Sequence, residues 1–83
     1  MKPEEITELG WYIETNPGGR NGCTLITDIG NEKIKMKDLT STDDLCQEAL
    51  YTINSSLENY TYEYICPPST LEEFKDNYPE FFL

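Results

Sequence analysis

The strongest constraint on the fold is a pair of alternating segments joined by a two-residue turn signal. Residues 23–29 and 32–39 alternate apolar and polar side chains, and Gly30-Asn31 between them is typical of a tight hairpin turn. Such a turn predicts that Ile29 pairs with Glu32 and that the pairing continues outward in the same register. The predicted apolar face then consists of Leu25, Thr27, Ile34 and Met36. The predicted polar face consists of Asp28, Lys33, Lys35 and Lys37.

The segment before this hairpin predicts a short helix followed by a strand. Pro3 suits the first position of a helix, and Gly10 is a suitable stop. Residues 11–15 alternate as a strand does, with Trp11 on the face opposite Tyr12. A turn rich in Gly and Asn, residues 16–22, should lead into the hairpin.

The segment after the hairpin is predicted to form the main helix. Residues 40–44 combine a hydroxyl cap with two carboxylates, which favour the first turn of a helix. Apolar residues follow at spacings of three and four as far as Glu58-Asn59, the pattern of an amphipathic helix. This stripe, expected to lie on the sheet, consists of Leu45, Cys46, Ala49, Leu50, Ile53 and Leu57.

The C-terminal segment predicts one more strand and a short helix. Residues 60–66 form the strand, and Ser69 followed by Glu72 has the pattern of a capping box. Pro79 should end this helix, whose apolar face consists of Leu71, Phe74 and Tyr78. The apolar tail, Phe81-Phe82-Leu83, either folds back onto the body or contacts a partner.

These elements predict one α+β domain spanning residues 1–83. Its expected architecture is a small antiparallel sheet of about four strands with the main helix packed on one face, in the order (α)βββαβα. The crossing helix leaves the place of the fourth strand open, because that strand could pair at either edge of the sheet.

Charge is the main indication of function. Sixteen acidic residues outnumber six basic ones, for a net charge of −10, and residues 38–83 contain ten of the acids but a single base, Lys75. Such a surface repels nucleic acid and anionic membranes and attracts basic proteins. We therefore expect a protein partner with a basic surface, such as a nuclease or another nucleic-acid-binding enzyme. No direct contact with nucleic acid or membrane is expected.

Catalysis, metal binding and cofactor binding are not indicated. The chain has no His, which removes the usual general base near neutral pH. Its three Cys residues are widely spaced and form no Cys-x-x-Cys motif, so we expect three reduced thiols, no catalytic residues, no metal site and no cofactor. No apolar run reaches about 18 residues and the first residues lack the apolar stretch of a signal peptide, which favours a cytoplasmic location.

A row of tyrosines leaves two interpretations open. Tyr60, Tyr62 and Tyr64 fall on one face of the predicted strand 60–66. They are core residues if that face lies under the helix, and interface anchors if it is exposed. Thr61 and Glu63 on the opposite face favour the core. The candidate partner-binding residues are Asp43, Asp44, Glu48, Glu58, Glu72, Glu73 and Asp76, with Tyr60, Tyr62 and Tyr64 as possible anchors.

Part of the chain resembles a known family. Asn21-Gly22-Cys23-Thr24-Leu25, followed by Asn31-Glu32-Lys33-Ile34-Lys35-Met36-Lys37, is similar to small phage proteins, the type II-C anti-CRISPR inhibitors that bind the HNH nuclease domain of the CRISPR effector. The likeness covers residues 11–39 and implies a nuclease target and the host cytoplasm. The family's Ser-Cys near the C-terminus has no counterpart, since Glu63-Tyr64-Ile65-Cys66 lacks the serine. No family site residue is therefore assigned.

The expected function is stoichiometric inhibition, of the phage counter-defence or immunity type. The acidic surface would block a basic nucleic-acid-acting protein by occupying its site. The alternative is a structural or regulatory subunit of a larger assembly, either a homo-oligomer or an accessory protein, and the oligomeric state stays open.

Overall fold

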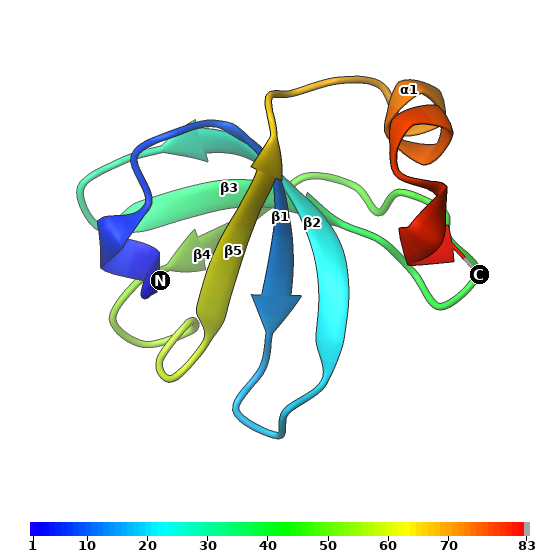
Figure 1. The fold of residues 1–83 in the computed structure, drawn as a ribbon. Coiled ribbons are helices and arrows are strands. Elements are labelled where there is room, and N and C mark those ends of the chain that lie inside the picture. Colours follow the sequence, from blue (N-terminus) through cyan, green and yellow to red (C-terminus); the bar gives the residue numbers. More distant parts are fainter. Residues whose placement is uncertain (83) are drawn as a thin grey trace.

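The computed structural model describes residues 1–82, which form a curved five-stranded antiparallel sheet with one short α-helix (Figure 1). The order across the sheet is β4-β3-β2-β1-β5, and all four pairings are antiparallel. The strands are β1 (Gly10–Thr15), β2 (Asn21–Ile29), β3 (Lys33–Asp38), β4 (Ala49–Thr52) and β5 (Thr61–Cys66). The helical elements are η1 (Pro3–Glu5), α1 (Leu71–Asn77) and η2 (Pro79–Phe82).

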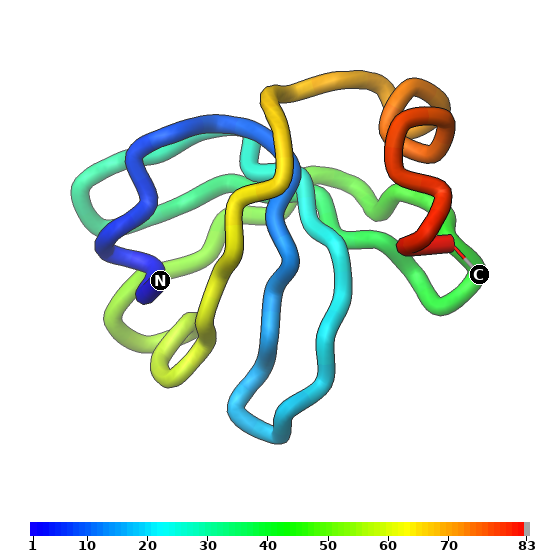
Figure 2. Tube along the Cα trace, in the orientation of Figure 1, coloured from blue at the N-terminus to red at the C-terminus, as the bar shows by residue number. Residues whose placement is uncertain are grey.

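The path of the chain explains this order. The first four strands follow one another as a meander, and the chain then returns so that β5 pairs with β1 (Figure 2). The α+β class and the antiparallel sheet are confirmed, and the open question of the last strand is answered. The sheet has five strands, however, rather than about four.

The predicted main helix over residues 40–58 is wrong. Residues 40–44 form a turn, in which the Thr40 hydroxyl accepts from the backbone N–H of Asp44 at 3.1 Å. Ala49–Thr52 then pairs with β3, and residues 53–59 form a second turn. Tertiary pairing overrides a local helical pattern here because the free edge of β3 offers backbone partners to an extended segment.

Residues of the predicted apolar stripe separate in the structure. Ile53 and Leu57 are buried on one face of the sheet, whereas Leu45 packs on the other face. Leu50 is 53% exposed. Ile53 and Leu57 have helical spacing in the sequence, but both lie in the turn 53–59. The last residue of this turn, Asn59, has a left-handed φ of 65°, which Asn tolerates.

The register predicted for the central hairpin is also wrong. Ile29 pairs with Ile34 rather than with Glu32, since the turn is longer and the Gly30 N–H donates to the Lys33 carbonyl at 2.8 Å. Next to the turn the pairing is thus two residues away from the prediction, and a β-bulge at Thr27 brings it back by one, so that Ile26 pairs with Met36. The strand β2 begins at Asn21, so the preceding loop spans residues 16–20 and is shorter than predicted.

The shifted register changes which side chains are buried together. Ile26, rather than Leu25, joins Ile34 and Met36 on one face of the sheet. Leu25 lies on the opposite face with Trp11. A one-residue shift has this effect because successive side chains of a strand point to opposite faces.

Both faces of the sheet carry a hydrophobic cluster. The Tyr12 cluster consists of Ile6, Tyr12, Ile26, Ile34, Met36, Ile53, Leu57 and Tyr62. The Trp11 cluster consists of Trp11, Leu25 and Phe74. The N-terminal segment and the turn 53–59 contribute to the first cluster, and α1 contributes to the second. Trp11 and Tyr12 therefore lie on opposite faces of β1, as their alternation predicts.

The C-terminal helix begins one residue later than predicted. Thr70, not Ser69, caps α1, and its hydroxyl accepts from the Glu73 N–H at 3.2 Å. Ser69 instead accepts a hydrogen bond from the Trp11 indole N–H at 3.1 Å. The predicted apolar face of α1 is confirmed, because its members all pack in the Trp11 cluster: Leu71, Phe74 and Tyr78.

The two ends of the chain are anchored differently. The predicted N-terminal helix is reduced to one 3₁₀ turn, after which Ile6 is buried while Leu9 is 42% exposed. Phe81 and Phe82 fold back onto the Trp11 cluster. Leu83, the last residue of the predicted tail, lies outside the described residues. Within residues 1–82 no helix has the length and apolar character needed to cross a membrane.

Candidate functional site

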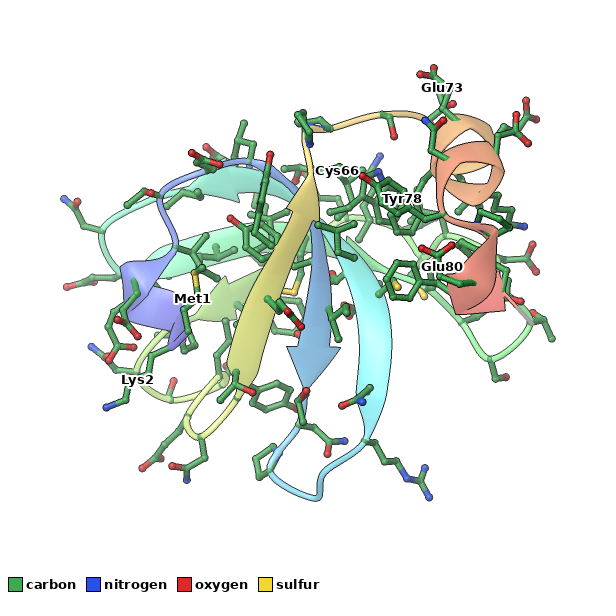
Figure 3. All side chains as sticks on the ribbon, in the orientation of Figure 1. Met1, Lys2, Cys66, Glu73, Tyr78 and Glu80 are labelled. Carbon is green, nitrogen blue, oxygen red and sulfur yellow. The ribbon has the colours of Figure 1, made fainter. Side chains whose placement is uncertain are left out.

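Three segments meet at one end of the sheet. The turn 40–44 lies beside η2 and α1, because Leu39 and Leu45 flank that turn and pack against the same cluster as Phe81 (Figure 1). These segments carry six carboxylates, a set that we call the acidic end: Asp43, Asp44, Glu72, Glu73, Asp76 and Glu80. Figure 3 shows Glu73 and Glu80 on this side of the molecule, far from Met1 and Lys2.

The acidic end contains five of the seven predicted acidic residues. The other two, Glu48 and Glu58, lie elsewhere. Glu48 accepts a hydrogen bond from the Thr27 hydroxyl at 2.6 Å, and Glu58 is exposed on the turn 53–59. Sequence reasoning missed Glu80. Its only signal was its position between Pro79 and the apolar tail, and only the folding back of that tail brings it to the same groove as Asp43.

A groove of about 560 Å³ opens at the acidic end. Its apolar lining comes from Ile13, Cys23, Leu39 and Phe81. Its polar lining comes from Asn21, Gly22, Thr40, Ser41, Asp43 and Glu80. The groove therefore combines an apolar floor with two carboxylates, one from the turn 40–44 and one from η2.

The turn 40–44 is held by its own backbone hydrogen bonds. The Asp43 N–H donates to the Thr40 carbonyl at 3.0 Å, and the Thr40 N–H donates to the Asp44 carbonyl at 2.8 Å. Asp43 has a left-handed φ of 61°, which is uncommon for a residue other than Gly. The surrounding bonds thus determine the backbone position from which the Asp43 side chain reaches the groove.

Cys23 in the groove is not an activated nucleophile. Burial raises the pKa of its thiol, and the negative charge of Asp43 raises that pKa further. The thiol is then protonated near neutral pH, whereas the thiolate is the reactive form. Cys23 therefore contributes a small apolar side chain to the lining of the groove.

The tyrosine row lies on the core side of β5. Tyr62 is only 2% exposed, which places this predicted anchor in the core rather than on a surface. Tyr60 and Tyr64 are half-buried and pack against the Tyr12 cluster. The ring of Tyr12 meets that of Tyr64 edge to face, with centroids 5.3 Å apart.

Two carboxylates and two phenols form a polar cluster on the same face. The Tyr62 hydroxyl donates to the Glu14 carboxylate at 2.6 Å, and the Tyr51 hydroxyl donates to that of Asp38 at 3.2 Å. Burial raises the pKa of Glu14, the hydrogen bond from Tyr62 opposes this, and the charge of Asp38 adds to it. The second oxygen of Asp38, Oδ1, is buried and has no hydrogen-bond partner within residues 1–82.

This cluster is not arranged as a metal site. Over the part of the chain that the structure describes, no group of three or more Cys, Asp or Glu side chains is placed to hold a metal ion. Its two hydrogen bonds join neighbouring strands: Tyr62 to Glu14 joins β5 to β1, and Tyr51 to Asp38 joins β4 to β3.

No protein-family model matches this chain, and neither the characterised proteins nor the solved structures contain a significant match to it. Function is therefore inferred from the molecule itself, chiefly from the acidic end and its groove.

Proposed function

We propose that this protein is a stoichiometric inhibitor that binds a basic surface of another protein through its acidic end. The observation that carries the proposal is the meeting of three distant segments, which gathers six carboxylates at one end of the sheet. Opposite charges on two proteins accelerate their encounter and orient them before close contact forms.

A nucleic-acid-binding site is the expected target surface. Such sites expose Lys and Arg side chains that contact phosphates. A protein that presents carboxylates in place of phosphates would occupy the site and exclude the nucleic acid. The resemblance of residues 11–39 to phage anti-CRISPR inhibitors supports a nuclease as the target class and phage counter-defence as the context.

The test measures how the protein associates with an HNH nuclease domain and how it affects DNA cleavage. Four residues of the acidic end are reversed together: Asp44→Lys, Glu72→Lys, Glu73→Lys and Asp76→Lys. A matched control reverses four exposed acids elsewhere: Glu4→Lys, Glu48→Lys, Glu58→Lys and Glu63→Lys. Both variants change the net charge equally. The first removes two exposed side-chain hydrogen bonds, from Thr42 to Asp44 and from Thr70 to Glu73, and the control removes one, from Thr27 to Glu48.

We expect the first variant to slow association about tenfold or more at low ionic strength, and the control to slow it much less. The variant that associates more slowly should also inhibit DNA cleavage less at a given protein concentration. Equal slowing by both variants would contradict a role for the acidic end. Undiminished cleavage at a molar excess of the unchanged protein would contradict inhibition of this target class.

The alternative function, a subunit of a larger assembly, is favoured by a different observation. The strand β4 lies at an edge of the sheet and carries Leu50, which is 53% exposed. An edge strand with an exposed apolar side chain can pair with a second copy. Sedimentation at micromolar concentration tests this alternative, because a compact monomer would contradict self-association.

A further inference from the structure

We infer that the groove at the acidic end is a pocket for a single arginine side chain of the partner protein. The inference rests on the proposed function, because that arginine would belong to the basic surface that the acidic end contacts. It adds a specific anchor to an interaction that is otherwise described only by charge.

The floor of the groove suits the aliphatic part of an arginine. Ile13 and Cys23 are opposite each other on β1 and β2, and Leu39 and Phe81 complete the apolar lining. All four side chains are partly exposed, so they offer apolar surface that a ligand can cover. Arginine buries its methylene groups along such a surface while its charged head stays near polar groups.

The rim of the groove suits the guanidinium group. Asp43 and Glu80 line the same groove from separate segments, so a cation between them is attracted by two carboxylates. A guanidinium has five N–H donors in one plane, and it can bond a carboxylate through two of them. Phe81 also lines the groove, and the π-system of an aromatic ring attracts a cation that lies over it.

These features favour arginine over lysine. An ammonium group is a strongly hydrated point charge: it can lie over a ring, but it lacks the planar fork that stacks on a ring and bonds a carboxylate in bidentate fashion. The turn 40–44 is also closed by hydrogen bonds before any partner binds. Less conformational freedom is then lost when the arginine enters, and this favours affinity.

The test titrates the ¹⁵N-labelled protein with N-acetyl-arginine methylamide and follows amide shifts by NMR. The citrulline and lysine analogues serve as comparison ligands, because citrulline keeps the shape of arginine but lacks its charge. We expect arginine to shift the amides of Cys23, Leu39, Asp43 and Phe81. Citrulline should bind about tenfold more weakly or not at all, and lysine should bind more weakly than arginine.

Variants locate the binding site. Asp43→Asn with Glu80→Gln should weaken arginine binding about tenfold, since both carboxylates are lost. Asn tolerates the left-handed φ of position 43, so the turn should persist. The matched control, Glu48→Gln with Glu58→Gln, changes the net charge equally away from the groove and should leave arginine binding nearly unchanged.

The outcomes separate this inference from the proposed function. Shifts outside the groove, or equal binding of lysine and arginine, would overturn the arginine pocket. If the reversed acidic end slows association with the nuclease while Asp43→Asn with Glu80→Gln does not, the pocket is wrong and the proposed function stands. If arginine binds in the groove but neither set of changes affects the nuclease, the proposed function is wrong and the pocket has another partner.

Discussion

The indole ring of Trp11 lies flat against the phenyl ring of Phe74, with the ring centroids 4.1 Å apart and the planes 4° from parallel. Both side chains are fully buried. The stack joins β1 to α1 and thereby holds the helix, with its three carboxylates, on one face of the sheet. Phe81 and Phe82 in turn pack on Phe74, so the position of η2 depends on the same contact.

Loss of the stack between Trp11 and Phe74 should lower the stability of the fold. We expect Phe74→Ala to lower the free energy of unfolding by about 3–5 kcal/mol, because a buried aromatic ring is removed and a cavity is left. Urea denaturation followed by circular dichroism measures this loss. Glu72→Ala, an exposed change in the same helix, is the control and should stay within about 0.5 kcal/mol. A loss below about 1 kcal/mol for Phe74→Ala would show that α1 is not held by this ring.

The partly buried hydrogen bond from Tyr62 to Glu14 should also contribute to stability. Tyr62→Phe keeps the ring but removes the donor, so we expect a loss of about 1.5–3 kcal/mol, the range for hydrogen bonds to charged groups. A double-mutant cycle with Glu14→Ala, which removes the acceptor, isolates the interaction between the two side chains. Strictly additive effects in that cycle would mean that the bond makes no net contribution.

Glu14 should make stability depend on pH in a definite direction. Its pKa in the folded protein is raised above the ordinary value of 4.5, chiefly by burial. The folded state therefore holds this proton more tightly than the unfolded state. The resulting stabilisation is complete below the unfolded pKa and is lost as the pH rises through the folded pKa.

Glu14→Gln removes this titration. We expect the variant to gain stability relative to the unchanged protein as the pH rises from about 4 to about 7, since an amide has no charge to desolvate. Urea midpoints measured at several pH values compare the two proteins directly. Parallel pH profiles would contradict a raised pKa at Glu14.

Gly10 should not tolerate a side chain. Its φ of 143° is rare for other residues, and a Cβ atom there would overlap the carbonyl oxygen of Cys66, a backbone atom of the neighbouring strand. We expect Gly10→Ala to destabilise the protein by more than about 1 kcal/mol by separating β1 from β5. Gly22→Ala is the control, because a Cβ at Gly22 meets open space. Similar unfolding midpoints for the two variants would contradict the close approach of β1 and β5.

The sequence by itself determined the short elements whose side-chain pattern matches the contacts that they make in the fold. The alternation of residues 11–15 and 60–66 predicted β1 and β5, and the spacing of Leu71, Phe74 and Tyr78 predicted the buried face of α1. The charge imbalance was also readable without a structure, because it requires only a count of residues.

Only the tertiary structure decided the conformation of residues 40–59, the register of the central hairpin and the position of the acidic end. Residues 40–59 have a helical pattern, yet they form turns and β4 because the edge of β3 supplies backbone partners. The bulge at Thr27 shows no local signal in the sequence. The groove requires that Asp43 and Glu80, 37 positions apart in the chain, line the same hollow. Such contacts depend on how the whole chain packs, and a local pattern contains no information about them.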